Sequence, residues 1–406
     1  CLHTNIVQIF ICHLQNAQPW FVMELAETNL EEEMPNLKWA KQAKAELQIP
    51  VSVVSAVMTP AMADEIISKG YVDMVAFGRT LLADPYWPKK AMEGHPEDIV
   101  PCLRCSNCYH ISSDHWNVGC SVNPRYHHQE FVPSEINLPK AETKKHVVIL
   151  GGGPAGMKAA ITASDRGHKV TIIEKQKELG GMLRFISKEA HKEEVQRLLD
   201  YYLTQIFKRE IEVLLNTEAD PELVKELQPD SLLIAFGAVE RILPIPGVEG
   251  EKVQLATKAI AHPEQLGQNI VILGGGSIGC EIGLELAENG KNVTILELTD
   301  TLAANANSLY REALRQKFLL HENLHSLLKC GCSRIEEDVV IYKNESGEEK
   351  QLPYDQLILS TGLVAQRQLV ESFYGICRDT VAIGDCVSPS NIMNANFEGY
   401  TAALNI

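Results

Sequence analysis

Apolar residues gather in short runs along the second half of the chain, and two of these runs repeat one another. The segment HVVILGGGPAGMKAAITASDRGHKVTIIEK, residues 146–175, aligns without a gap with NIVILGGGSIGCEIGLELAENGKNVTILEL, residues 269–298. Each copy has a β-branched run, three glycines, a small-residue helix that stops at a glycine, and a second strand ending in glutamate. The pattern therefore predicts two β-α-β units.

The glycines of both copies have the spacing G-x-G-x-x-G of a dinucleotide-binding turn. The first glycine permits the tight turn, the second lets a pyrophosphate approach the backbone, and the third lets the helix pack against the strand. The helix offers free N–H groups to the phosphates, and the glutamate can accept hydrogen bonds from ribose hydroxyls. The alternative is two β-α-β units that bind nothing. We expect two dinucleotide sites, formed by Gly151, Gly153, Gly156 and Glu174 in the first copy and by Gly274, Gly276, Gly279 and Glu297 in the second.

A second alternation of strand and helix patterns precedes the glycine-rich half. Val51 to Val57 and Asp73 to Gly78 have strand patterns, and Ala61 to Lys69 between them has the pattern of a helix. The order strand, helix, strand, helix suits the end of a (β/α)8 barrel. A whole barrel takes about 250 residues, so residues 1–100 are expected to hold only a carboxy-terminal remnant of a TIM barrel.

Four of the eleven cysteines lie together in PCLRCSNCYHISSDHWNVGCSVNPR, residues 101–125. Three thiolates at intervals of three residues, with a fourth further along, suit a [4Fe-4S] cluster. Zinc is the main alternative, because His110 and His115 offer further ligands. An odd thiol count and a reducing compartment disfavour disulfides. The candidate ligands, spaced C-x2-C-x2-C-x11-C, are Cys102, Cys105, Cys108 and Cys120.

The composition is that of an ordinary globular protein, with 45% hydrophobic and 22% charged residues. A formal net charge of -16 leaves no basic stripe for phosphates, which argues against nucleic acid or an anionic membrane surface as a partner. No apolar run approaches the roughly 18 to 20 residues that span a bilayer, and the amino end lacks a leader pattern. We expect a cytoplasmic protein; nothing in the sequence indicates its oligomeric state.

The glycine-rich half resembles the two-dinucleotide-binding flavoprotein reductases, in which a nicotinamide domain is inserted into a flavin domain. The resemblance rests on LGGML, IAFGA, LSTG and VAIGDC, which follow the glycine turns in that family's order. It implies that the first unit binds FAD, with Ala155, Gly181 and Asp385 as further contacts. It also implies that the second unit binds a nicotinamide cofactor. The implied ranges are 145–242 and 355–406 for the two parts of the FAD domain and 243–354 for the NAD(H)-binding domain.

Nearby residues bear on the cofactor and on the electron route. Glu297 would repel a 2′-phosphate, and LELTDTLAANANS offers no arginine to bind one, so we expect NADH rather than NADPH. The cysteine pairs of disulfide-reducing relatives are missing, because Cys280 stands alone and the Cys330 and Cys332 of KCGC have another spacing, in an expected loop. Electrons would then leave FAD through the cysteine segment, residues 101–128.

From about Met34 to its end, the chain resembles the NADH:flavin oxidoreductases related to old yellow enzyme, specifically the long members that include 2,4-dienoyl-CoA reductase and trimethylamine dehydrogenase. The resemblance implies an FMN-type barrel whose phosphate site would use Gly78 and Arg79. That family carries glycine at the preceding strand end, where this chain has Ser55 and Ala56. A side chain there would crowd the phosphate. The resemblance implies electron flow from NADH to FAD, [4Fe-4S], FMN and a small-molecule substrate with an activated C=C bond; the catalytic residues stay unidentified.

The expected fold class is α/β, a remnant of a (β/α)8 barrel followed by a Rossmann-like reductase module for FAD and NAD(P). Two other functional interpretations stay open. One is an NADH-oxidising electron-transfer module that passes electrons to a partner protein, and the other is an inactive, truncated family member. The glutamate synthase small subunit also joins a cysteine-rich segment to this reductase fold, but the barrel-like segment argues against it.

Overall fold

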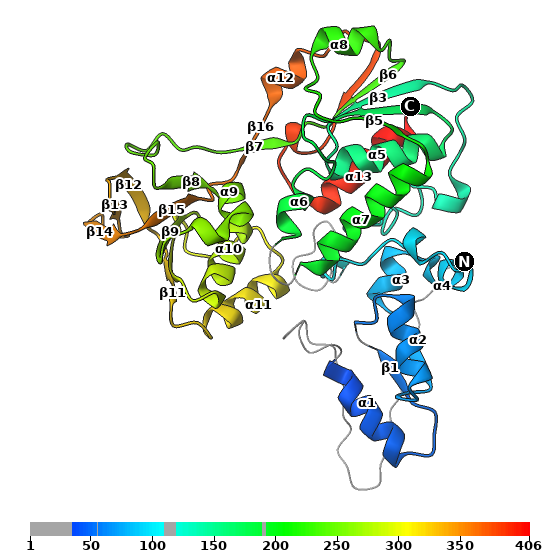
Figure 1. Ribbon diagram of the computed structural model, residues 1–406, viewed down its shortest axis with the longest axis horizontal. Helices are drawn as coiled ribbons and strands as arrows, with labels where there is room; N and C mark the ends of the chain where they lie inside the picture. The colour runs from blue at the N-terminus through cyan, green and yellow to red at the C-terminus, as the bar shows by residue number, and fades with distance from the viewer. Residues whose placement is uncertain (1–34, 55, 109–118, 189–191) are drawn as a thin grey trace.

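The computed structural model describes residues 35–54, 56–108, 119–188 and 192–406. Ser55, His110 and His115 lie outside these ranges, as do residues 1–33 of the expected barrel remnant. Figure 1 shows a small α/β part at the amino end, drawn in blue, and two larger units, each built on its own sheet.

The amino-terminal part has the strand and helix order expected of a barrel fragment. β1 (Ser52–Val54) and β2 (Met74–Ala76) pair in parallel, with Val53 opposite Val75. The helix between them starts at a proline, and the Thr59 hydroxyl caps it by accepting from the Met62 N–H at 3.2 Å. The strands enclose a small core with α1 (Pro35–Glu46) and α2 (Pro60–Ser68). Two short helices follow, α3 (Arg79–Ala83) and α4 (Trp87–Met92), and Ala83 packs into the core of the first large unit.

The first large unit is a sheet of five parallel strands in the order β17-β6-β3-β4-β5. Both faces are covered, and this explains why the central strands are continuous apolar runs. The strands are β3 (His146–Leu150), β4 (Lys169–Ile173), β5 (Glu212–Leu214), β6 (Ser231–Ile234) and β17 (Asp379–Ala382). The helices are α5 (Pro154–Asp165), α6 (Leu183–Ile186), α7 (Glu193–Lys208), α8 (Pro221–Glu226), α12 (Arg367–Glu371) and α13 (Ile392–Leu404).

The second unit repeats this arrangement with the strand order β11-β10-β9-β15-β8, again all parallel. Its strands are β8 (Val253–Leu255), β9 (Asn269–Leu273), β10 (Asn292–Leu296), β11 (Leu324–Leu327) and β15 (Gln356–Leu359). Its helices are α9 (Ala256–Ala261), α10 (Ser277–Glu288) and α11 (Ser308–Phe318). Between β11 and β15 the chain forms a separate antiparallel sheet of three strands, made of β12 (Gly331–Ile335), β13 (Val339–Lys343) and β14 (Glu349–Pro353).

The two units correspond strand by strand, as the sequence repeat predicts. β3 and β9 start 123 residues apart (269 − 146), and so do β4 and β10 (292 − 169). Each pair encloses a twelve-residue helix, α5 or α10. Both expected β-α-β units are therefore present.

The chain passes between the units through a short antiparallel pair, β7 (Ala238–Glu240) with β16 (Leu363–Ala365). β15, Gln356–Leu359, still lies inside the second sheet, between β9 and β8. The second sheet thus reaches beyond residue 354, where the nicotinamide domain was expected to end. The chain returns to the first sheet only with β17.

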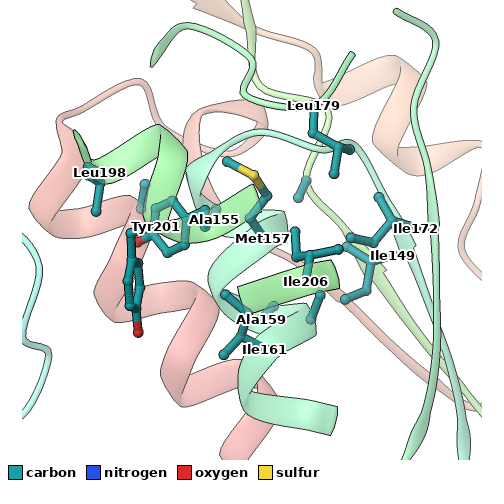
Figure 2. Close-up of a cluster of buried hydrophobic side chains, with 14 of the residues drawn as sticks. Ile149, Ala155, Met157, Ala159, Ile161, Ile172, Leu179, Leu198, Tyr201 and Ile206 are labelled. Carbon is teal, nitrogen blue, oxygen red and sulfur yellow. The ribbon is translucent and has the colours of Figure 1, made fainter. Parts of the chain in front are cut away.

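A dense core fixes α5 against the first sheet. Figure 2 shows Met157 of this helix with Leu198 on one side and Ile149 and Ile172 on the other. These side chains and Ile161 belong to one cluster, and all five are at most 4% exposed. Burial of this kind contributes about 1.5–3 kcal/mol for each large apolar side chain. The core therefore holds the amino end of α5, and the glycine turn before it, in a fixed place on the sheet.

Among the residues that the structure describes, no helix combines the length and the apolar character that crossing a membrane requires.

Candidate functional site

The first glycine turn has the geometry that a dinucleotide needs. Gly151 has a φ of +109°, and a Cβ there would overlap the Ala235 carbonyl. A Cβ on Gly156 would overlap the Gly151 carbonyl, so only glycine allows α5 to start this close to β3. Gly153 differs, because a Cβ there would meet nothing within 4 Å. The space in front of Gly153 is thus open at the amino end of α5, where a pyrophosphate binds.

Two further predicted residues lie at this turn. Glu174, which follows β4, accepts from the Gly152 N–H at 2.7 Å and from the Gln176 N–H at 2.8 Å. These bonds hold its carboxylate beside the turn. Gly181 has a φ of +52°, and a Cβ on it would lie 2.9 Å from the Gly153 Cα. The LGGML segment therefore passes directly against the turn, and only a residue without a side chain fits there.

Asp385 reaches the same turn from the far end of the chain. A Cβ on the neighbouring Gly384 would lie 3.1 Å from the Ala155 Cβ, so this segment rests on the first turn of α5. Asp385 accepts from the Ser390 N–H at 3.0 Å, and burial raises the pKa of its carboxyl. α13 then packs on α5 so closely that a Cβ on Gly399 would overlap the Ala155 carbonyl. The structure thus brings Ala155 and Asp385 together.

The second glycine turn repeats the first. Gly274 has a φ of +103°, and a Cβ on it would overlap the Ser360 carbonyl. A Cβ on Gly279 would overlap the Gly274 carbonyl, whereas one on Gly276 would meet nothing within 4 Å. Gly276 therefore faces open space at the amino end of α10.

Glu297 holds the second turn as Glu174 holds the first. Its carboxylate accepts from the Gly275 N–H at 2.6 Å, and from the Thr299 N–H at 2.7 Å and hydroxyl at 2.8 Å. None of the described arginines pairs with it. The charge at this turn is therefore negative and uncompensated, which disfavours a 2′-phosphate.

The four predicted cysteines lie close enough to influence one another. Burial raises the pKa of the Cys102 and Cys120 thiols to about 12 and that of Cys108 to about 11, and neighbouring thiols of the group raise all three further. All nine cysteines in the described residues are free thiols in this structure.

The spacing of the sulfur atoms bears on the metal. No three of the four have Sγ atoms within 4.8 Å of one another. A tetrahedral zinc with Zn–S bonds of about 2.3 Å would need them about 3.8 Å apart. In the part of the chain that the structure describes, one group of potential metal ligands has its ligand atoms within 4.8 Å of one another, namely His95, Glu97 and Asp98. Lys208 already pairs with both of its carboxylates, at 2.5 and 2.8 Å.

Hydrogen bonds from outside the predicted set tie the cysteine segment to the first unit. The Ser121 hydroxyl lies 3.1 Å from the Cys105 Sγ and accepts from the Asn107 side chain at 2.9 Å. The Ser121 carbonyl accepts from the Asn396 side chain of α13 at 2.6 Å. Asn396 is fully buried and also accepts from the Tyr202 hydroxyl. The cysteine segment is thus bonded directly to the helix that packs beside the first glycine turn.

The same segment contacts the other two parts of the molecule. Arg79, at the start of α3, donates to the Ser106 hydroxyl at 3.3 Å, and its charge opposes the rise in the pKa of Cys102 and Cys108. Asn307, the cap of α11, donates from its side chain to the Cys105 carbonyl at 3.1 Å. Gly78, beside Arg79, is open, since a Cβ there would meet nothing within 4 Å. The four thiols therefore lie where all three parts meet.

Known families match both halves of the chain. A family model of the pyridine nucleotide-disulphide oxidoreductases matches residues 145–399. The chain belongs to this family. A model of the NADH:flavin oxidoreductase / NADH oxidase family matches residues 11–98. The expected resemblance is confirmed, and this match begins earlier than Met34, where we expected it to start.

Relatives and a solved structure extend this likeness over almost the whole chain. The NADH oxidase of Thermoanaerobacter brockii is 38% identical over 378 residues, 90% of this chain and 57% of the relative. The cinnamate reductase of Clostridium sporogenes is 32% identical over 372 residues, 89% of this chain and 54% of the relative. A structure of 2-naphthoyl-CoA reductase with 2-naphthoyl-CoA has a TM-score of 0.85 at 30% identity and covers 92% of this chain and 56% of that one. The chain thus spans about half the length of the proteins it matches.

Two of the described thiols outside the cysteine segment, Cys280 and Cys332, are poor candidates for attack on a disulfide. Cys280 is fully buried in α10, and burial raises the pKa of its thiol to about 12. Cys332 lies in strand β12 rather than in a loop, which corrects our expectation for KCGC. It was misassigned because the strand is short and pairs only with β13, later in the chain. Burial raises the pKa of Cys332 to about 11, so its thiolate, the form that attacks disulfides, is scarce at neutral pH.

Proposed function

We propose that the chain is an NADH-dependent flavin oxidoreductase that reduces an activated C=C bond of a small molecule. Bound NADH, FAD, [4Fe-4S] cluster and FMN would supply hydride transfer at the two ends of this route and single-electron transfer between them. The observation that carries the proposal is the position of the cysteine segment. Its Ser121 carbonyl accepts from Asn396 of the first unit, the flavin unit of this proposal, and its Ser106 hydroxyl accepts from Arg79 of the barrel fragment.

The first glycine turn would hold FAD. Gly153 and Ala155 offer the open amino end of α5 to the pyrophosphate, and Gly181 closes over it without a side chain. Glu174 has acceptor capacity for the adenosine ribose hydroxyls while it holds the Gly152 N–H. Asp385 would accept hydrogen bonds from the ribityl chain.

The second turn would hold NADH in the same way, with Gly276 toward the pyrophosphate and Glu297 toward the ribose. We expect NADH to be preferred, because the carboxylate would repel the extra phosphate of NADPH. Steady-state rates with the two cofactors test this preference. A lower KM for NADPH would contradict it.

The cysteine segment, residues 101–128, would hold the cluster through Cys102, Cys105, Cys108 and Cys120. The sulfur spacing supports iron over zinc, because the thiols are farther apart than one zinc ion allows. Gly78 and Arg79 would bind the FMN phosphate, since bare backbone and a guanidinium suit that group.

Anaerobic purification with flavin, iron and sulfide analysis tests the assignment. We expect about four iron atoms and four sulfides per chain, as the cluster formula requires, together with FAD. Zinc, or iron far below that content, would overturn the cluster. Oxidation of NADH with cinnamate as the probe then tests the ene-reductase activity, and product analysis separates reduction of the C=C bond from reduction of dioxygen.

The second candidate is an NADH-oxidising electron-transfer module. It is favoured by one observation: in the described ranges the barrel part has a single pair of strands, β1 and β2. FAD and iron without FMN, together with NADH-dependent reduction of an artificial electron acceptor but not of cinnamate, would support it.

A further inference from the structure

A small pocket lies where the barrel fragment, the cysteine segment and the flavin unit meet. Its volume is about 50 Å³, and a single water needs about 10–15 Å³. Ala83 of α3, Val122 of the cysteine segment, Lys158 of α5 and Tyr400 of α13 are among its lining residues. The pocket is therefore large enough for one small ion and lies away from both glycine turns.

Lys158 is the unusual residue of this pocket. The side chain is 5% exposed, yet no described residue forms an ion pair or a hydrogen bond with its ammonium group. The ring centre of Tyr400 lies 5.2 Å from its Nζ, and the charges of Glu135 and Asp165 act on it from nearby. Burial lowers the pKa of the ammonium. Those two carboxylates offset the burial only in part, so the site favours an anion that can enter.

A second polar group in the pocket also has no partner. The Ser134 residue is 8% exposed, and its buried hydroxyl makes no hydrogen bond within the described chain. The Tyr400 hydroxyl donates to the Pro133 carbonyl at 3.0 Å, and no hydrogen bond among the described residues joins it to Lys158 or Ser134. One ammonium and one hydroxyl thus line the same small space, and both can donate to an anion.

The nearby carboxylates are already engaged. Asp84 and Glu135 both line the pocket, and Lys90 pairs with them at 2.7 and 3.3 Å. Arg125 is a further cation in the lining. Lys90, Arg125 and Lys158 thus stand against two carboxylates, which leaves an excess of one positive charge around the pocket.

We propose that this pocket binds a small monovalent anion of chloride size between the Lys158 ammonium and the Ser134 hydroxyl. The anion neutralises the lysine and joins the loop that carries Ser134 to α5. The site does not depend on the proposed electron route, so a failure of the ene-reductase assignment leaves it standing.

Thermal unfolding of the full chain, purified anaerobically, tests the site. The salt is sodium chloride or sodium gluconate at one ionic strength, because gluconate is too large for the pocket. Chloride at about ten times its Kd is expected to raise the unfolding midpoint by about 2 °C, and Lys158→Met is expected to abolish the difference. Lys177→Met is the matched control, since Lys177 is 73% exposed and lies outside the pocket. A wild type without the chloride effect, or a K158M variant that keeps it, overturns the proposal.

Crystals soaked in sodium bromide give a direct readout. An anomalous peak is expected within hydrogen-bond distance of both the Lys158 Nζ and the Ser134 Oγ. The Ser134→Ala variant removes one donor and no charge, and it is expected to lower the occupancy of the bromide. This variant tests the site even if K158M does not fold. Absence of the peak from wild-type crystals, or equal occupancy in the S134A variant, contradicts the proposed geometry.

Discussion

At the scale of single residues, Ser121 is the group best placed to influence an iron–sulfur cluster. The Asn107 amide donates to its hydroxyl at 2.9 Å, which leaves the hydroxyl hydrogen free to point at the Cys105 sulfur, 3.1 Å away. A hydrogen bond to a ligand sulfur stabilises the more negative, reduced state of a cluster. Ser121 would therefore raise the reduction potential.

We predict that Ser121→Ala lowers the midpoint potential of the cluster by about 40 mV, because one hydrogen bond contributes about 1 kcal/mol and a one-electron shift of 59 mV corresponds to about 1.4 kcal/mol. A redox titration followed by electron paramagnetic resonance measures it. Ser106→Ala is the control, since its hydroxyl bonds to Arg79 rather than to a thiol. Equal potentials in all three proteins would show that Ser121 does not bond the cluster sulfur.

The sequence offered the four cysteines and the turn glycines as candidates, but it did not indicate the residues that hold these segments in place. Gly153, Gly276 and the four cysteines belong to local spacings, which are visible in one segment. Ser121 and Asn396 are 275 positions apart, and Asn307 and Cys105 are 202 apart. Such bonds exist only once the sheets and helices have packed, and a lone serine or asparagine carries no signal for them.

At the scale of elements, the glycine turns allow binding and folding to be separated. We predict that Gly276→Ala leaves folding intact, because its Cβ would enter open space at an ordinary φ of -67°. The same Cβ would stand where a pyrophosphate meets the backbone, so the KM for NADH should rise about tenfold or more, equivalent to at least about 1.4 kcal/mol.

Gly279→Ala makes the same substitution three residues further along the chain and serves as the comparison for Gly276→Ala. Its Cβ would overlap the Gly274 carbonyl, so it should destabilise the second unit by about 1–3 kcal/mol. Thermal unfolding and NADH kinetics on both variants distinguish the two roles. A G276A protein with wild-type KM would mean that no dinucleotide binds at this turn.

Ala56 gives a second element-scale prediction, at the connection from β1 to α2. It has a φ of +47°, a conformation that costs a residue with a Cβ roughly 1–2 kcal/mol. Ala56→Gly removes this strain. Glycine also raises the conformational entropy of the unfolded chain, which destabilises the folded state by about 0.4–1 kcal/mol. We therefore expect a net stabilisation of about 0.5–1 kcal/mol. FMN binding should also tighten, because the phosphate would meet bare backbone.

Urea unfolding and a fluorescence titration with FMN measure the two effects. Ala43→Gly, the same substitution inside helix α1, is the control and should destabilise by about 1 kcal/mol. If A56G destabilises as much as A43G, the left-handed conformation is not imposed by the fold.

The elements also show why one boundary could not be predicted. β15 has four residues and follows the three-stranded antiparallel sheet, so its apolar run looks like the start of the returning flavin domain. Its place is decided by pairing with β9, whose register sets Leu357 beside Val271. Local periodicity contains no information on which sheet a short buried strand joins.

At the scale of the whole molecule, a group of side chains ties the second unit, which would bind the nicotinamide cofactor, to the first unit, which would bind the flavin. They are called the nicotinamide unit and the flavin unit below. Lys192, just before α7, pairs with Glu281 of α10 at 2.7 Å, and Glu281 also accepts from the Tyr310 hydroxyl of α11. The Glu281 side chain is 14% exposed and that of Lys192 is 24% exposed. Asn307 on α11 adds the bond to the Cys105 carbonyl. The covalent connections between the two units run through β7 and β16.

We predict that Glu281→Ala loosens the nicotinamide unit without unfolding it. The variant leaves Lys192 and Tyr310 without their shared acceptor, at a cost of about 1–2 kcal/mol after allowance for solvent. Hydrogen exchange in α10 and α11 should accelerate. NADH-dependent flavin reduction should slow several-fold at unchanged NADH affinity, because hydride transfer depends on alignment of the two units. Glu312→Ala is the control, since Glu312 pairs with Arg315 within α11 and both are exposed. If hydrogen exchange in α10 and α11 accelerates equally in E312A, the effect reports the stability of the helices and not the contact between the units, and the prediction fails.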